Sequence, residues 1–168
     1  GAVYNIGTIN GINVDFIDNH TKGIGSQGGA IYNKGTIKSI NADFISNYVL
    51  SSDIRGGVGG AILNERTIGD ITGDFTGNYA LSNGTDASGG AIFSYIQGKI
   101  ASISGNFTGN YAQSIGIAYG GAVDNWGIIN SITGNFTNNY AQSDSDWAQG
   151  GAVYNIGTIN GINVDFID

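Results

Sequence analysis

The sequence predicts an all-β fold, a parallel β-helix (β-solenoid) in which each repeat of about 30 residues forms one coil. Three regularities carry this prediction: a Gly-Gly-Ala-(Ile/Val) tetrad, a Phe at a fixed distance after it, and alternating apolar and polar residues before that Phe. The tetrads begin at Gly28, Gly59, Gly89, Gly120 and Gly150, at intervals of 31, 30, 31 and 30 residues. Because one repeat cannot bury its own apolar face, the copies must stack on one another.

The Phe lies fifteen residues after the second Gly of the tetrad in five copies. In the copy that begins at Gly89 it lies seventeen residues after, because of a two-residue insertion around Tyr95–Gly98. Asn recurs three residues after Phe, and a second Asn column follows the tetrad. The first column contains Asn19, Asn47, Asn78, Asn110 and Asn139, and the second contains Asn5, Asn33, Asn64, Asn125 and Asn155. We expect both columns to occupy turns, where the amides bond to the coils above and below.

The five residues that end at each Phe, such as 12–16 and 40–44, alternate between apolar and polar side chains. This alternation predicts one strand with a buried face and a wet face. An Ile three residues before each segment, such as Ile37 before Ile40, breaks the period of two and predicts a bend or bulge. The two Ile columns and the Phe column should fill the interior, while Ser82–Ser88 and Ser143–Gln149 are predicted as loops.

The composition fits stacked coils and excludes several classes of protein. Only 11% of residues are charged and there is no proline, as expected where like charges would repeat about 4.8 Å apart and every strand needs its N–H. The chain has no cysteine, and therefore no disulfide framework, and it has no apolar run long enough for a transmembrane helix. A net charge of −7 disfavours nucleic acid and anionic membranes as partners.

A longer repeat is superimposed on the short one, since residues 151–168 are identical to residues 1–18. Five coils therefore form a unit of 150 residues, and 151–168 restart it, so that 1–168 is predicted to be one continuous solenoid segment. We expect the chain to be a slice of something longer, either tandem units, which we favour, or separate units joined head to tail. Five coils at about 4.8 Å each would give an axial repeat of roughly 24 Å.

The paired motifs resemble those of the chlamydial polymorphic outer membrane proteins and related autotransporter passenger domains. The matching stretches are GGAIYN (28–33) with FISN (44–47), GGAIL (59–63) with FTGN (75–78), GGAIF (89–93) with FTGN (107–110), and GGAV (120–123) with FTNN (136–139). The resemblance covers the whole chain and implies a right-handed β-helix that is displayed or secreted by a bacterium and acts in adhesion. The greater regularity of this sequence favours a structural fibre.

A column of acidic residues and amides before the Phe is the strongest catalytic candidate. It contains Asp15, Asp43, Asp74, Asn106, Asn135 and Asp165. Stacking would place neighbouring carboxylates about 4.8 Å apart, near the ~5–5.5 Å of a retaining glycosidase pair. The simpler interpretation is the wet face of a strand, where Asp and Asn interchange, and we prefer it.

Several other polar residues are candidate ligands. Asp53, Asp144, Ser145 and Asp146 offer oxygen ligands for a cation, but solvated loops are the preferred interpretation. His20 replaces the Tyr found after Asn in later copies, and a single His without Cys predicts no transition-metal site. The sequons at Asn19, Asn83, Asn106 and Asn135 matter only in a glycosylating host.

Two exposed-looking columns suggest binding surfaces. A Thr column of the kind that ice-binding solenoids use contains Thr8, Thr36, Thr67 and Thr158, but Lys99 and Ile128 interrupt it. An aromatic column contains Tyr4, Tyr32, Phe93 and Tyr154. Because Asp124 occupies the same position, we expect this column to face water, where it could bind sugars or a neighbouring fibre, or merely support the coil.

The sequence therefore assigns no catalytic, cofactor-binding or metal-binding residue and predicts no cofactor. The leading hypothesis is a non-enzymatic, extracellular or cell-surface structural or adhesive solenoid that associates with itself end to end or continues as a tandem array. A host-surface or glycan ligand is compatible with this hypothesis. The alternative is a carbohydrate-active enzyme or a sugar-binding module on the same scaffold.

Overall fold

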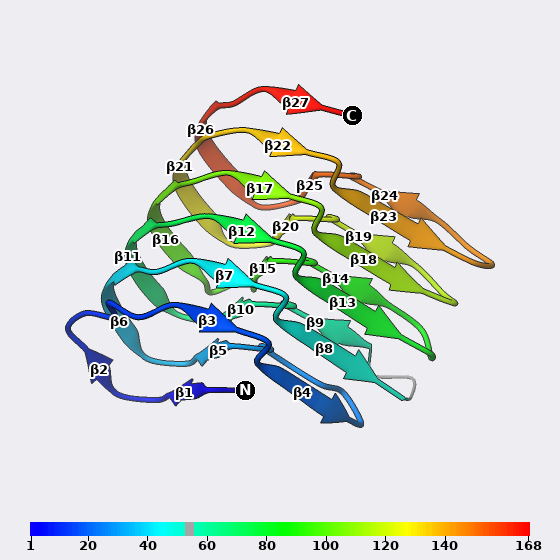
Figure 1. Ribbon diagram of the computed structural model, residues 1–168, viewed down its shortest axis with the longest axis horizontal. Coiled ribbons are helices and arrows are strands. Elements are labelled where there is room, and N and C mark those ends of the chain that lie inside the picture. Colours follow the sequence, from blue (N-terminus) through cyan, green and yellow to red (C-terminus); the bar gives the residue numbers. More distant parts are fainter. Residues whose placement is uncertain (53–55) are drawn as a thin grey trace.

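The computed structural model describes residues 1–52 and 56–168, which form 27 strands and no helix. Neighbouring strands within each sheet are parallel and come from successive coils (Figure 1). The two termini lie at opposite ends of the stack (Figure 1). The predicted parallel β-solenoid, with one coil per repeat, is thus confirmed. Over the same residues, no helix is long and apolar enough to cross a membrane.

Three sheets enclose the main part of the solenoid, which we call the body. Sheet A contains β1 (Val3–Asn5), β5 (Ile31–Asn33), β10 (Ile62–Asn64), β15 (Ile92–Ser94), β20 (Val123–Asn125) and β25 (Val153–Asn155). Sheet B contains β2 (Thr8–Ile9), β6 (Thr36–Asn41), β11 (Thr67–Thr72), β16 (Lys99–Ser104), β21 (Ile128–Thr133) and β26 (Thr158–Asn163). Sheet C contains β3 (Phe16–Ile17), β7 (Phe44–Ile45), β12 (Phe75–Thr76), β17 (Phe107–Thr108), β22 (Phe136–Thr137) and β27 (Phe166–Ile167).

Two further sheets form a flattened extension on one side of the body, which we call the arm (Figure 1). Sheet D contains β4 (His20–Gly23), β8 (Tyr48–Ser51), β13 (Tyr79–Ser82), β18 (Tyr111–Ser114) and β23 (Tyr140–Ser143). Sheet E contains β9 (Gly57–Val58), β14 (Ala87–Ser88), β19 (Ala118–Tyr119) and β24 (Ala148–Gln149). In the four coils that contribute a strand to both sheets, the chain runs outward through sheet D and returns through sheet E (Figure 1).

The body is filled by the columns that the sequence predicts. Phe44, Phe75 and Phe107 are fully buried, and their rings stack with centroids 4.8 and 4.7 Å apart and almost parallel planes. Both Ile columns lie beside them, as at Ile68 and Ile71. Identical residues thus stack in register from coil to coil. Each buried side chain contributes roughly 1.5–3 kcal/mol of hydrophobic stabilisation.

The strand predicted before each Phe is only partly correct. Side chains in 40–44 do alternate between buried and more exposed positions, but β6 ends at Asn41 and β7 begins at Phe44. Ala42 and Asp43 instead form the corner between sheets B and C, so the alternation continues around a bend. The bend or bulge expected between the two Ile columns is a bend, because the pairing between β11 and β16 skips one residue on each strand, Gly69 and Ala101, and neither strand has an extra residue.

Both Asn columns form hydrogen-bonded ladders, as predicted. The Asn78 amide donates from Nδ2 to Phe44 O at 2.8 Å and to Asn110 Oδ1 at 2.9 Å, and the side chain is fully buried. The column after the tetrad bonds in the same way, with Asn33 Nδ2 donating to Asn64 Oδ1 at 2.9 Å. Ser94 interrupts this second ladder in the coil that carries the insertion, and its hydroxyl is buried without a partner among the described residues.

The Gly-Gly pair marks the neck where the arm rejoins the body. The first Gly has a positive φ in every tetrad, for example 66° at Gly59, which a residue with a side chain adopts only at a cost. A Cβ on the second, Gly60, would lie 1.9 Å from Gly90 O and 2.6 Å from Tyr79 O. The returning chain therefore passes against both the next coil and the outgoing strand β13, and only glycine fits there.

The segments predicted as loops, Ser82–Ser88 and Ser143–Gln149, contain strands at their ends, which corrects that expectation. Only residues 83–86 and 144–147 lie outside strands, at the tip of the arm. Sheets D and E face each other across a small separate core. Its members are Val49, Ala80, Ala87 and Ala112, all fully buried. These small side chains let the two sheets approach closely. Because they are only weakly apolar, their pattern in the sequence does not predict strands.

Candidate functional site

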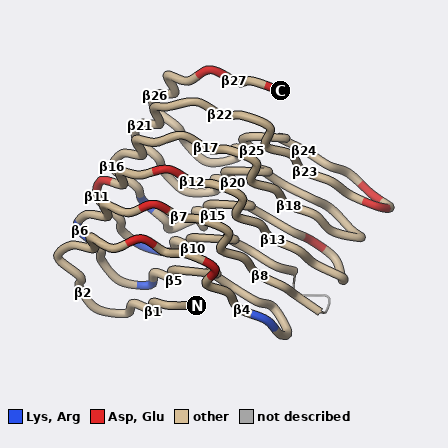
Figure 2. The backbone as a smooth tube through the Cα atoms, in the orientation of Figure 1, with Lys and Arg blue, Asp and Glu red and all other residues tan. Residues whose placement is uncertain are grey.

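The acidic column runs along the outside of the body at the corner before sheet C (Figure 2). Its side chains accept hydrogen bonds from backbone amides of the next coil: Asp43 Oδ1 from the N–H of Asp74 at 2.8 Å, and Asp74 Oδ1 from the N–H of Asn106 at 2.7 Å. In the same way, Asp15 Oδ1 accepts a hydrogen bond from the N–H of Asp43 at 3.0 Å. The column thus occupies a wet, outward face, as expected, and its carboxylates stabilise the stacking of the coils.

The cation-ligand candidates do not come together into a site. Asp144 and Asp146 are exposed at the tip of the arm, where the backbone N–H of Asp146 donates to Ser143 Oγ at 2.8 Å. Ser145 donates from its hydroxyl to Ile115 O at 2.6 Å. Asp53 lies outside the described residues. Across residues 1–52 and 56–168, no group of three His, Cys, Asp or Glu side chains is placed to hold a metal ion.

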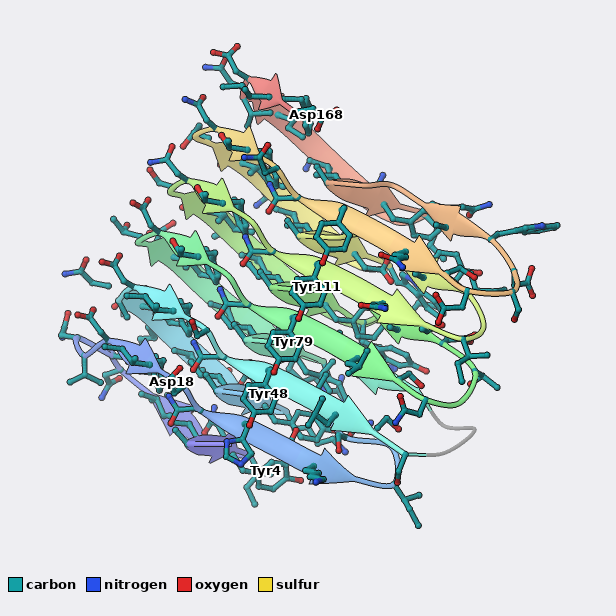
Figure 3. The ribbon with its side chains drawn as sticks, turned by 45° about the vertical axis from the view of Figure 1, so that its right-hand side comes forward. Tyr4, Asp18, Tyr48, Tyr79, Tyr111 and Asp168 are labelled. Carbon is teal, nitrogen blue, oxygen red and sulfur yellow. The ribbon has the colours of Figure 1, made fainter. Side chains whose placement is uncertain are left out.

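His20 begins a stack of rings on sheet D, as its position in the Tyr column suggested. Its ring lies 4.8 Å from that of Tyr48, with planes only 4° apart. Tyr48, Tyr79 and Tyr111 continue the stack up the arm (Figure 3), with centroids 4.8 and 4.9 Å apart. Burial raises the pKa of Tyr111 to about 12, with a smaller contribution from the neighbouring tyrosines. The stack therefore stabilises the arm.

The Thr column lies on sheet B, where Lys99 pairs with Thr67 and Ile128 pairs with Lys99, so the rank is interrupted as the sequence indicated. The sequon residues Asn83, Asn106 and Asn135 are exposed, whereas Asn19 is half-buried and donates from Nδ2 to Asn47 Oδ1 at 3.0 Å.

The expectation that the aromatic column of sheet A faces water is wrong for the central coils. Tyr4 is 61% exposed in the first coil, but Leu63, Phe93 and Asp124 are exposed by 1%, 5% and 0%. The side chains do point out of the body. The arm covers them because sheet E, which the sequence did not predict, lies across this face.

Where sheet A and sheet E meet, they leave a groove of about 650 Å³. One wall is the outer face of sheet A and the turns after it, with Leu63, Glu65 and Phe93. The other wall is sheet E and its approach, with Val58, Ser88 and Tyr119, and with Gln27 and Asp86 nearby. These residues come from successive coils, so the groove follows the solenoid axis.

An aromatic cluster forms one wall of the groove. Phe93 contacts the ring of Trp126 edge to face at 5.5 Å and that of Tyr95 at 6.0 Å. The rings of Tyr95 and Trp126 lie 6.1 Å apart with planes 22° from parallel. Tyr95 belongs to the two-residue insertion and is 42% exposed. We call Phe93, Tyr95 and Trp126 the aromatic platform.

Asp124 lies beside the platform and is completely buried between sheets A and E. The Ser88 hydroxyl and the Trp126 indole lie near its carboxylate, but neither meets hydrogen-bond geometry, so both carboxylate oxygens and Trp126 Nε1 have no partner among the described residues. Burial raises the pKa of Asp124 to about 7, although Ser88 and Trp126 partly offset that increase. The ring of Tyr119, which lines the groove, lies 4.6 Å from that of Tyr154.

Glu65 lies at the rim of the groove and already has partners. The Tyr32 hydroxyl donates to its Oε1, and Lys34 Nζ lies 3.7 Å from its Oε2. Burial, followed by the bond to Glu65, raises the pKa of Tyr32. This partly exposed cluster fixes the position of the Glu65 carboxylate and pairs it with a cation, so the acidic character of the groove rests mainly on Asp86.

Little of this site was predictable from the sequence. The insertion at Tyr95–Gly98 was visible and so were the two tryptophans, but Tyr119 and the wall of sheet E belong to segments without a motif. Comparison with family models, with curated proteins and with solved structures finds no match for this chain. The fold is therefore that of a β-solenoid with repeats of about 30 residues and stacked Phe, Tyr and Asn ladders, and no family is identified.

Proposed function

We propose that this chain is a non-enzymatic structural element of an extracellular or cell-surface fibre, in which five-coil units continue one another along the solenoid axis. The observation that carries the proposal is the identity of residues 151–168 with residues 1–18. The sixth coil therefore repeats the surface that the first coil uses to bind the second. An adhesive role and an autotransporter type of parent belong to the same proposal and rest on the shared GGAI and FxxN motifs.

The geometry of the last coil supports continued stacking. Phe166 is 59% exposed and Ile162 is 45% exposed, whereas the equivalent Phe75 and Ile71 are fully buried beneath the coil that follows them. Adding a coil would remove this apolar surface from water and satisfy a row of strand N–H and C=O groups. Both terms favour end-to-end association.

A carbohydrate-active enzyme is the less favoured candidate. Its best acid–base residues, Asp15, Asp43 and Asp74, accept backbone hydrogen bonds, and none of them lines the groove. Carboxylates engaged in this way contribute to coil stacking rather than to an opposed catalytic pair.

Sedimentation velocity over a range of protein concentrations tests the fibre proposal. The chain should form linear oligomers that grow with concentration, and Phe166→Asp should abolish them by placing a charge in the stacking surface. Ile128→Asp is the matched control, because Ile128 is 39% exposed on the side of sheet B. A chain that stays monomeric throughout, or equal association by both variants, would contradict the proposal.

A further inference from the structure

The groove between sheets A and E has the dimensions and lining of a ligand site. Its volume of about 650 Å³ falls within the range of roughly 300–1,000 Å³ that is typical of small-molecule pockets. The lining combines the aromatic platform with separate polar groups on both walls. Because the groove follows the solenoid axis, it suits an extended chain molecule better than a compact one.

We propose that this groove binds a neutral glycan, with sugar rings stacked on Tyr95 and Trp126. A pyranose ring presents an apolar C–H face, which fits a flat aromatic surface, and a rim of hydroxyls. Those hydroxyls meet acceptors and donors at Gln27, Glu65 and Asp86, which line the two walls of the groove. The site does not depend on the fibre proposal, since it is complete within one chain.

The charge of the groove restricts which classes of sugar can bind. The described residues that line it include Glu65 and Asp86 and no Lys or Arg, and because Lys34 pairs with Glu65 at the rim, the negative charge of the groove rests mainly on Asp86. Carboxylates and sulfates of acidic glycans would be repelled from this surface. Neutral hexoses and N-acetylhexosamines carry no such penalty.

The arrangement of the rings argues against a cationic ligand such as a quaternary ammonium group. A cage for such a cation needs rings that surround an open space, whereas the three rings of the platform contact one another at 5.5 to 6.1 Å. The Glu65 carboxylate also has Lys34 as an ionic partner. A ligand can therefore contact only the outer surface of the aromatic platform, which suits the apolar face of a sugar ring.

Unpartnered polar atoms at the base of the platform provide an independent indication of a ligand. Trp126 Nε1 and both oxygens of Asp124 are buried without hydrogen bonds among the described residues, which is costly in a folded protein. A hydroxyl can accept from the indole N–H and donate to the carboxylate at the same time. A sugar that tilts the Trp126 ring and inserts a hydroxyl there would satisfy both groups.

The two tryptophans of the chain allow a direct binding assay. Trp147→Phe leaves Trp126 as the only indole, and Trp126→Phe leaves Trp147, which is 67% exposed at the tip of the arm. Titration with cellohexaose, maltohexaose, mannohexaose and hexa-N-acetylchitohexaose should change the fluorescence of the first variant and not that of the second. Polygalacturonate and choline are titrated in parallel as an acidic glycan and a cation.

Isothermal titration calorimetry with the strongest of these oligosaccharides then tests the platform. Tyr95→Ala should weaken binding by about tenfold or more, as expected for a central aromatic contact, and this exposed residue can be changed without disturbing the core. Trp147→Ala is the matched control and should leave affinity unchanged. Absence of binding by all four neutral oligosaccharides, binding by choline or polygalacturonate instead, or equal effects of the two variants would overturn the proposal.

Discussion

The body and the arm are built from the same parallel coils but are stabilised differently. In the body, Phe and Ile columns are buried in every central coil, as at Phe75 and Ile71. In the arm, the buried core consists of one Val and three Ala side chains, and the larger rings of the Tyr stack lie on its surface. Hydrophobic stabilisation scales with apolar area removed from water. The body should therefore provide most of the stability of each coil.

The same difference explains where the candidate site lies. The buried columns of the body and the Tyr stack of the arm carry ladders of identical residues, which support stacking. The groove forms where the arm covers sheet A, and there the columns become irregular, with Leu63, Phe93 and Asp124 at equivalent positions. Regular positions build the solenoid, and departures from the repeat build the site.

Truncating one buried side chain in the body and one in the arm should give the largest difference in stability between the two regions. Phe75→Ala in the body should lower the free energy of unfolding by about 3–5 kcal/mol, through lost burial and the cavity left in the Phe stack. Val49→Ala in the arm should cost roughly 2 kcal/mol or less, because fewer atoms are removed from a shallow core. Urea denaturation followed by circular dichroism measures both values. Equal costs would show that the arm is as tightly packed as the body.

Asp124, which lies where the body and the arm meet, should make stability depend on pH. Its pKa is about 7 in the folded protein, against about 3.9 in an unfolded chain. The folded state therefore binds the proton more tightly, so this stabilisation is complete in acid and is lost as the pH rises through 7. Between pH 5 and pH 8 the free energy of unfolding should fall by about 2–3 kcal/mol from this group.

Denaturation curves at the two pH values with Asp124→Asn measure that contribution. The variant carries no charge at either pH, so it should lose this part of the pH dependence. Asp74→Asn, at an exposed position of the body, is the control and should retain it. An unchanged pH dependence in Asp124→Asn would mean that the carboxylate is not buried between sheets A and E.

The smallest expected effect concerns the turn that leads from the body into the arm. Ser46 has a φ of 54°, whereas the equivalent positions in the next two coils are Gly77 and Gly109, with φ of 61° each. A left-handed backbone conformation costs a non-glycine residue about 1 kcal/mol. Ser46→Gly should therefore raise the thermal midpoint by a few degrees in scanning calorimetry. A lowered midpoint would indicate that the Ser46 side chain contributes more than its backbone strain costs.

The body was predictable from the sequence because its apolar residues recur at fixed positions and are large. Phe75 and Ile71 had to stack on their copies, and the Asn ladders followed from the same register. The arm was not predictable in the same way. Its strands contain small and polar residues such as Ala87 and Ser88, whose burial depends on a facing sheet rather than on local alternation.

The candidate site was not predictable either, because one of its walls is sheet E of the arm. The sequence predicts that Asp124 faces water, because an acidic residue in a column of aromatics normally indicates exposure. Its burial results from the arm crossing sheet A, a contact between segments whose sequences do not predict it. The platform residue Tyr95 was visible only as part of an insertion, and its partner Trp126 had no motif.

The most direct test of the central claim, that coils continue one another along the axis, is electron microscopy of filaments with analysis of their power spectra. Stacked coils predict a layer line near 4.8 Å from the strand spacing. Covalent tandem units should add an axial repeat of five coils, about 24 Å, and separate chains stacked end to end should add one of six coils, about 29 Å. Filaments without the 4.8 Å layer line, or compact particles with no axial periodicity, would contradict the claim.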